Sequence, residues 1–149
     1  ITEVKKMDAK QIVTVYGIGI GGGLAIGVGS NNIKVRRIIA DAPYPDFETV
    51  KKRLMDVKQI DLMIPPGAEK TLFEPRFAIQ DKGQHIEGYL LIVSANGKVI
   101  TEADMKSLQA LRKKSIEIYT VPDTENKDNF TSDKNAYFNH VKAFLDKKF

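Results

Sequence analysis

Residues 11–30 read QIVTVYGIGIGGGLAIGVGS, and this stretch decides how the fold begins. Its first part, residues 11–16, is rich in β-branched side chains and too short for a helix, so it predicts a strand buried on both faces. Glycines at positions 17, 19 and 21–23 follow and predict a tight turn. The small residues of 22–30 predict a helix that packs closely against a sheet.

Outward from this stretch, apolar strands alternate with segments of helical periodicity. Further strands are predicted over 34–40, 89–93 and 116–121. Such alternation returns each strand in the same direction, which predicts an α/β fold with a mostly parallel sheet of about four or more strands flanked by helices. We expect residues 1–149 to form a single domain, with 59–87 as an insertion of undefined structure.

Helix ends are marked by side chains that can cap them. Asp46 can cap a helix that runs to about Lys58, Thr101 with Asp104 resembles a capping box, and Ser132 can cap the last helix. Inward-facing positions on these helices are expected at Phe47, Val50, Leu54, Val57, Met105, Leu108, Leu111, Tyr137, Val141, Phe144 and Leu145.

Composition excludes several classes of protein. The chain has no cysteine, which excludes disulfides, thiol catalysis and cysteine-ligated metal sites. Its net charge of +4 is spread over scattered basic pairs without interleaved aromatic residues, so we expect no nucleic-acid partner. The mostly apolar residues 12–28 are too short and too rich in glycine for a transmembrane segment.

The glycine-rich turn has one interpretation as a nucleotide site. Gly17, Gly19 and Gly22 fit the G-x-G-x-x-G pattern between a strand and a helix. Asp41 stands at the end of the next strand, where its carboxylate could bind a ribose hydroxyl. The alternative hypothesis is therefore a Rossmann-like dinucleotide-binding domain.

A second interpretation comes from resemblance. The stretch VYGIGIGGGLA at 15–25 resembles the nucleophile elbow of the α/β-hydrolase family, in which the turn is G-x-S-x-G. Residues 38–44, 89–100 and 116–122 are similar to the segments that follow the elbow in that family. The resemblance runs over about residues 2–149, is weakest over 59–87, and covers the C-terminal part of the chain, which the dinucleotide pattern leaves unexplained.

The resemblance implies positions for the reacting groups, and none carries the family's residue. The nucleophile position is Gly19, the acid position is Gly97 and the histidine position falls near Asn126, while the backbone N–H of Ile20 is the implied oxyanion donor. A hydroxyl nucleophile needs a base, and the base needs an orienting partner. We therefore expect a domain without hydrolytic activity or cofactor, retained for binding or interaction. A further hypothesis is an active serine hydrolase whose serine has been replaced at residue 19.

The resemblance also implies that the chain supplies only the last four strands of the family's sheet. The predicted strand 11–16 then becomes an apolar edge, and such edges invite pairing. We expect a preceding N-terminal segment or a homodimer contact to cover it. A stable monomer would instead mean that the insertion 59–87 folds back as the missing neighbour.

Overall fold

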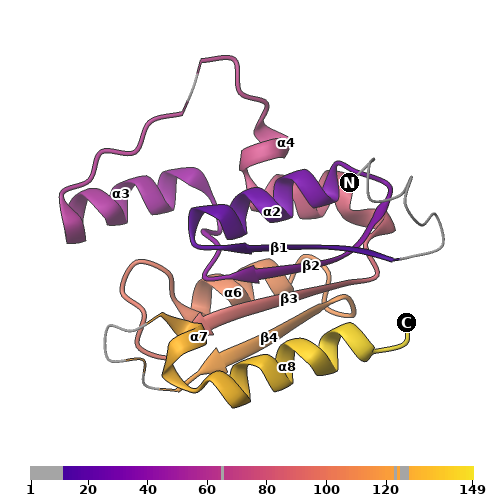
Figure 1. Cartoon of the computed structure of the whole chain (residues 1–149). Helices are drawn as coiled ribbons and strands as arrows, with labels where there is room; N and C mark the ends of the chain where they lie inside the picture. The colour runs from indigo at the N-terminus through magenta and orange to yellow at the C-terminus, as the bar shows by residue number, and fades with distance from the viewer. Residues whose placement is uncertain (1–11, 65, 123, 125–127) are drawn as a thin grey trace.

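Four parallel strands form the centre of the molecule, in the order β1-β2-β3-β4 (Figure 1). The computed structural model describes residues 12–149 apart from 65, 123 and 125–127. The strands are β1 (Val13–Ile18), β2 (Val35–Asp41), β3 (Gly88–Ser94) and β4 (Ile116–Val121). Helices lie on the connections between successive strands, as a parallel sheet requires. The predicted α/β class is confirmed.

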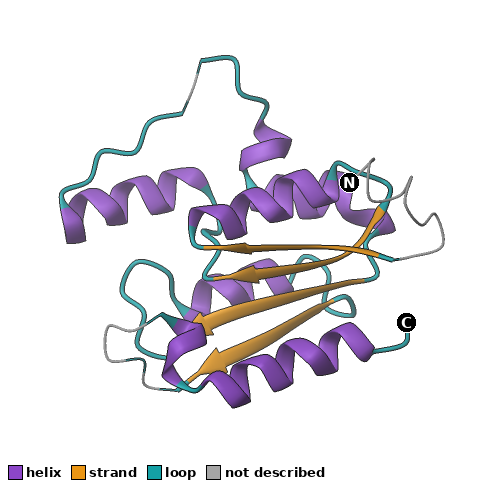
Figure 2. Cartoon of the chain, viewed as in Figure 1, coloured by secondary structure: helices purple, strands orange, loops and turns teal. Residues whose placement is uncertain are grey.

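Helices cover both faces of the sheet (Figure 2). On one face, α2 (Ile20–Ser30) and α6 (Glu102–Gln109) pack over the larger apolar cluster, and α8 (Lys134–Asp146) packs over the smaller cluster on the other face. The other helices and turns are α3 (Phe47–Lys58), α4 (Lys70–Phe73), α5 (Pro75–Phe77), the π-helical turn η1 (Ala78–Lys82), the 3₁₀ turn η2 (Gly83–His85) and α7 (Asn129–Ser132). The inner strand β3 is covered from both sides, which accounts for its uninterrupted apolar run.

Two of the three predicted caps are confirmed. The Asp46 side chain accepts a 2.8 Å hydrogen bond from the Thr49 N–H at the start of α3. Thr101 and Asp104 form a reciprocal capping box on α6. The prediction of Ser132 as the cap of the last helix is wrong. Ser132 ends the short helix α7, and the next residue, Asp133, caps α8.

Two predicted inward positions are exposed. On α3, Val50 is buried. Val57 is 44% exposed, because the C-terminal part of α3 extends past α2 and has no core beneath it (Figure 1). On α8, Tyr137 and Phe144 are buried on the sheet, whereas Leu145 is 42% exposed. Leu145 follows Phe144 by about 100° around the helix, which turns it away from the sheet.

The segment 59–87 packs on α2 and does not extend the sheet. The part that the structure describes contains helical turns and no strand, so this segment does not supply a neighbour for the first strand. Its contacts lie over α2 instead, where the Asn31 side chain donates to the Thr71 carbonyl at 2.7 Å. Tyr44 is tied to the same segment by a 2.6 Å bond to the Phe73 carbonyl.

The first strand lies two residues later than predicted. Gln11 is outside the described residues, and β1 continues through Gly17 and Ile18, which pair with Ala40 and Asp41 of β2. The turn is therefore confined to Gly19, and α2 begins at Ile20 instead of Gly22. Glycine at position 17 did not end the strand, because a glycine can adopt extended backbone as readily as a turn.

Candidate functional site

The turn between β1 and α2 holds Gly19 in a backbone conformation that residues with a side chain rarely adopt. Its φ is 62° and its ψ is −126°. Its N–H donates to the Asp41 carbonyl at 2.7 Å, and its own carbonyl accepts from the Gly22 N–H at 2.9 Å. A Cβ added at position 19 would meet nothing within 4 Å. The turn therefore directs position 19 into open space, which is how a nucleophile elbow exposes its side chain.

Neighbouring glycines are explained by the close approach of α2 to the sheet. A Cβ on Gly17 would lie 2.1 Å from the Gly21 carbonyl oxygen. A Cβ on Gly22 would lie 3.0 Å from the Asp41 carbonyl oxygen. Packing alone thus accounts for two of the glycines in the proposed nucleotide pattern. Ile20, the implied oxyanion donor, is the first residue of α2, so its N–H is one of the four that a helix leaves without an intrahelical acceptor.

The carboxylate of Asp41 lies inside a buried polar network at the end of β2. The residue is only 2% exposed. Its Oδ1 accepts from the Asn129 amide at 2.6 Å, and its Oδ2 accepts from the Tyr137 hydroxyl at 2.6 Å. The Tyr137 hydroxyl is also 2.7 Å from that of Tyr16 on β1. Because Asp41 is buried among these partners, a ribose hydroxyl could reach its carboxylate only if the surrounding side chains moved.

Burial sets the protonation behaviour of this network. Burial raises the pKa of Asp41, and the hydrogen bonds from Tyr137 and Asn129 only partly offset that effect. Burial and the adjacent carboxylate together raise the pKa of Tyr137, so its phenol stays protonated and donates to Asp41. The network binds α7 and α8 to the ends of β1 and β2.

The loop that follows β3 is closed around Gly97. A Cβ at this position would lie 2.1 Å from the Ile100 carbonyl oxygen, so an aspartate side chain could enter only if the loop moved. In the same loop, the Ser94 hydroxyl donates to the Asn96 Oδ1 at 2.6 Å. Thr124, beyond the end of β4, lies 2.9 Å from the Ser94 hydroxyl. Neutral side chains therefore join the two loops in which the resemblance places an acid and a histidine.

The structure brings some of the predicted site residues together. Gly17, Gly19, Ile20, Gly22 and Asp41 meet at the adjoining ends of β1 and β2. The loop of Gly97 follows β3, which is separated from β1 in the sheet by β2. Asn126 lies outside the described residues.

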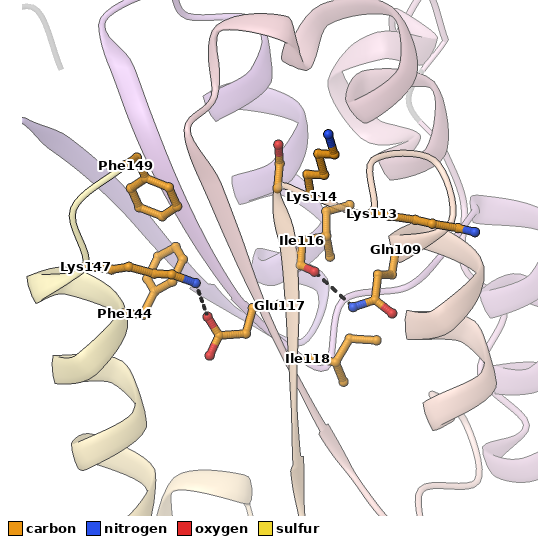
Figure 3. A pocket seen from close by; sticks show the side chains of 10 residues that line it. Gln109, Lys113, Lys114, Ile116, Glu117, Ile118, Phe144, Lys147 and Phe149 are labelled. Carbon is orange, nitrogen blue, oxygen red and sulfur yellow. Dashed lines mark hydrogen bonds and ion pairs between the residues drawn. The ribbon is translucent and has the colours of Figure 1, made fainter.

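A surface pocket of about 350 Å³ lies at the other end of the sheet, where β4 begins (Figure 3). Lys113, Lys114 and Lys147 line it, and Lys147 pairs with Glu117 at 3.4 Å. The Gln109 amide closes one side by donating to the Ile116 carbonyl at 3.0 Å. Because all four strands run in parallel, this pocket is remote from the turn at Gly19.

The described part of the chain contains neither a candidate metal cluster nor a membrane-spanning helix. Among those residues, no group of three or more His, Asp or Glu side chains could hold a metal ion. No helix in the same part is long and apolar enough to span a membrane.

Comparison with solved structures identifies the fold. The Pyrococcus furiosus esterase Pf2001 superposes on 97% of this chain with a TM-score of 0.70 and 14% identity. An esterase domain of a Rhodothermus marinus protein covers 96% with a TM-score of 0.66 and 12% identity. The acylaminoacyl peptidase of Pyrococcus horikoshii covers 97% with a TM-score of 0.65 and 11% identity. These proteins share the α/β-hydrolase fold, and this chain has that fold.

The similarity is one of structure, and it covers part of each solved protein. The chain spans 57% of the Pf2001 esterase, 63% of the Rhodothermus marinus domain and 26% of the peptidase. No protein-family model and no curated protein sequence matches the chain. The resemblance to the α/β-hydrolase family is thus confirmed at the level of the fold.

Sequence reasoning missed the partners of Asp41. Asn129 and Tyr137 are separated from it by 88 and 96 residues, and no local pattern joins such positions. One signal did exist. Tyr137 stands on the predicted inward face of the last helix, and a buried tyrosine hydroxyl usually finds a polar partner.

Proposed function

We propose that this chain is an α/β-hydrolase-like domain that binds a ligand or partner and does not hydrolyse esters or peptides. The observation that carries the proposal is glycine at position 19, in the turn that would present the nucleophile. Without a side chain there, no covalent intermediate can form at this position. The N–H of Ile20 then has no oxyanion to stabilise.

The remaining catalytic positions support the same proposal. The loop at Gly97 has no room for a carboxylate, and a neutral cluster joins it to Thr124. Of the two histidines, His85 precedes β3, at the end of the strands opposite the elbow, and its Nε2 lies 2.9 Å from the Asn32 carbonyl. His140 stacks on Tyr119, with ring centroids 3.7 Å apart. Both rings therefore have structural contacts away from the turn.

A Gly19→Ser variant tests whether the rest of the catalytic machinery exists. We expect neither the wild type nor this variant to hydrolyse p-nitrophenyl acetate faster than a Gly21→Ser control. The control suits the comparison because position 21 also has open space around a Cβ and lacks a positive φ. Turnover by Gly19→Ser well above that of Gly21→Ser would contradict the proposal. It would favour an active serine hydrolase altered at residue 19, with its acid and base at positions other than 97 and 126.

Titration with NAD tests the dinucleotide alternative. We expect no saturable binding, since the Asp41 carboxylate is buried within its hydrogen-bonded network and is closed to a ribose hydroxyl. Micromolar binding that is abolished by Asp41→Ala and retained in Asn129→Ala would favour the dinucleotide-binding domain over the hydrolase-like domain. The second variant separates loss of a ligand contact from loss of the network.

The proposal extends to the edge of the sheet. No described strand pairs with the outer side of β1, and Tyr16 and Ile18 on this strand are 46% and 45% exposed. A segment preceding the elbow or a second copy of the chain would cover this edge.

A further inference from the structure

We infer that the outer edge of β4 is a docking groove for an acidic segment of a partner protein, which binds in extended form as an added strand of the sheet. The inference does not depend on the absence of hydrolysis, because the pocket beside β4 lies at the opposite end of the strands from Gly19. The residues that line this groove include Lys113, Lys114, Ile116, Ile118, Phe144 and Lys147 (Figure 3).

The backbone of β4 leaves hydrogen-bonding groups open along the groove. The Ser115 carbonyl accepts from β3, whereas the Ile116 carbonyl accepts from the Gln109 amide on the outer side at 3.0 Å. Backbone groups alternate in direction along a strand, so the N–H and carbonyl groups of Ile118 and Thr120 also point outward. No residue that the structure describes forms a hydrogen bond with these outward groups. Such an edge is a template on which an extended peptide adds a strand.

This edge lies on the far side of the sheet from β1. The strand order is β1-β2-β3-β4, and the resemblance to the hydrolase fold places any segment that precedes the elbow beside β1. Helices α6 and α8 flank β4 on its two faces and give the groove its walls (Figure 3). A segment that covers β1 therefore leaves the β4 groove open to a partner.

Charge selects an acidic occupant. The groove is lined by Lys113, Lys114 and Lys147 and by one carboxylate, that of Glu117. Glu117 pairs with Lys147 at 3.4 Å, and no described residue forms an ion pair with Lys113 or Lys114. These two cations attract carboxylates and repel basic segments. Nucleic acid also carries negative charge, but only a peptide supplies amide groups that can pair with the open edge of the strand.

A buried cation behind the groove adds to the positive potential. Arg37 is only 6% exposed, and its guanidinium donates to the carbonyls of Phe144 and Lys147. The Phe149 ring, which lines the groove, lies 4.9 Å from this guanidinium. No described carboxylate pairs with Arg37. Its charge is therefore not neutralised by an acid, and the low-dielectric surroundings extend its field into the groove.

Fluorescence anisotropy with a labelled octapeptide of alternating glutamate and valine tests the inference. We expect saturable micromolar binding to the wild type, about tenfold weaker binding to Lys113→Ser/Lys114→Ser, and unchanged binding to Lys51→Ser/Lys52→Ser. The control lysines are also adjacent and exposed, and their loss changes the charge equally, but they lie on α3. No saturable binding by the wild type, or an equal loss in the two double variants, would overturn the inference.

A backbone variant separates strand addition from attraction by charge alone. Thr120→Pro removes one outward N–H and keeps the hydrogen bonds to β3, a change that an edge strand tolerates. We expect it to melt close to the wild-type temperature and to bind the peptide about fivefold more weakly. A peptide of alternating glutamate and proline has the same charge but lacks half of the backbone donors, and we expect it to bind the wild type about tenfold more weakly than the first peptide.

Two outcomes of these experiments would assign the groove differently. Equal binding of the two peptides to the wild type would mean that charge alone holds the ligand, and it would overturn strand addition. A wild-type dimer in sedimentation that Thr120→Pro dissociates would mean that a second copy of the chain occupies this edge, and it would overturn the acidic partner.

Discussion

Tyr137→Phe removes one hydroxyl from the buried network and leaves the ring in place. That hydroxyl donates to the Asp41 carboxylate at 2.6 Å and contacts the Tyr16 hydroxyl at 2.7 Å. A hydrogen bond to a charged group contributes about 1.5–3 kcal/mol, and a neutral one about 0.5–1.5 kcal/mol. Tyr16 is half exposed and can turn to water, so we expect its bond to contribute toward the low end of the neutral range. We expect the free energy of unfolding at pH 7 to fall by about 2–4 kcal/mol.

The dependence on pH identifies the cause of this loss. Burial raises the pKa of Asp41 above its ordinary value. The free energy of unfolding therefore falls as the pH rises through the folded-state pKa and Asp41 ionises. Removing the Tyr137 donor raises that pKa further, and the variant should lose stability more steeply over the same window. The difference from the wild type should therefore be largest at neutral pH and shrink as the pH is lowered.

Urea unfolding followed by circular dichroism at several pH values measures the effect, with unchanged m-values showing that the unfolded state is comparable. Tyr16→Phe is the matched control, and we expect it to lose about 0.5–1.5 kcal/mol. A loss below about 0.5 kcal/mol in Tyr137→Phe, or an equal loss in both variants, would refute the reasoning that the Tyr137 hydroxyl stabilises a charged Asp41 carboxylate.

Two further predictions concern the packing of α2 and the attachment of α3. Gly27→Ala should lower the free energy of unfolding by about 1–3 kcal/mol, because the added Cβ would lie 1.8 Å from the Leu72 carbonyl oxygen. Gly21→Ala has open space around the added Cβ and should raise the free energy of unfolding by up to about 1 kcal/mol. Thermal melts of both variants check this, and similar melting temperatures would contradict it. Arg53→Met should cost about 1–3 kcal/mol at pH 7, because it removes the guanidinium that pairs with Asp104. Burial alone would raise the pKa of Asp104, but hydrogen bonds from Arg53 and the Thr101 cap lower it overall. The cost of Arg53→Met should therefore disappear as acid protonates Asp104 below its unfolded pKa. Urea titrations at several pH values measure this cost, and a cost that does not change with acid would argue against the pair.

Local patterns predicted the elements well, because each depends on residues close together in the chain. The strand over 116–121 was placed to the residue, and the Thr101 capping box was read from residues three apart. Errors arose where a neighbouring residue could serve equally well, as with Asp133 in place of Ser132. The exposed position of Val57 was not predictable, since helical periodicity identifies an apolar face but not how far the core extends beneath it.

The candidate site was predictable only in part, for a related reason. The conformation at Gly19 follows from a strand, a glycine and a helix in direct succession, all of which the sequence contains. The closed loop at Gly97 and the engagement of Asp41 depend on atoms brought together by the tertiary fold. Sequence reasoning could name these positions, but not what surrounds them.

The geometry at Gly19 also bears on the balance between stability and activity. A residue with a side chain in so sparsely populated a backbone region costs of order 1–3 kcal/mol, a cost that an enzyme bears to hold its nucleophile in place. Glycine adopts φ 62° and ψ −126° without that strain. A domain that performs no hydrolysis would therefore be more stable with glycine at this turn than with serine, and selection for stability alone would favour the glycine.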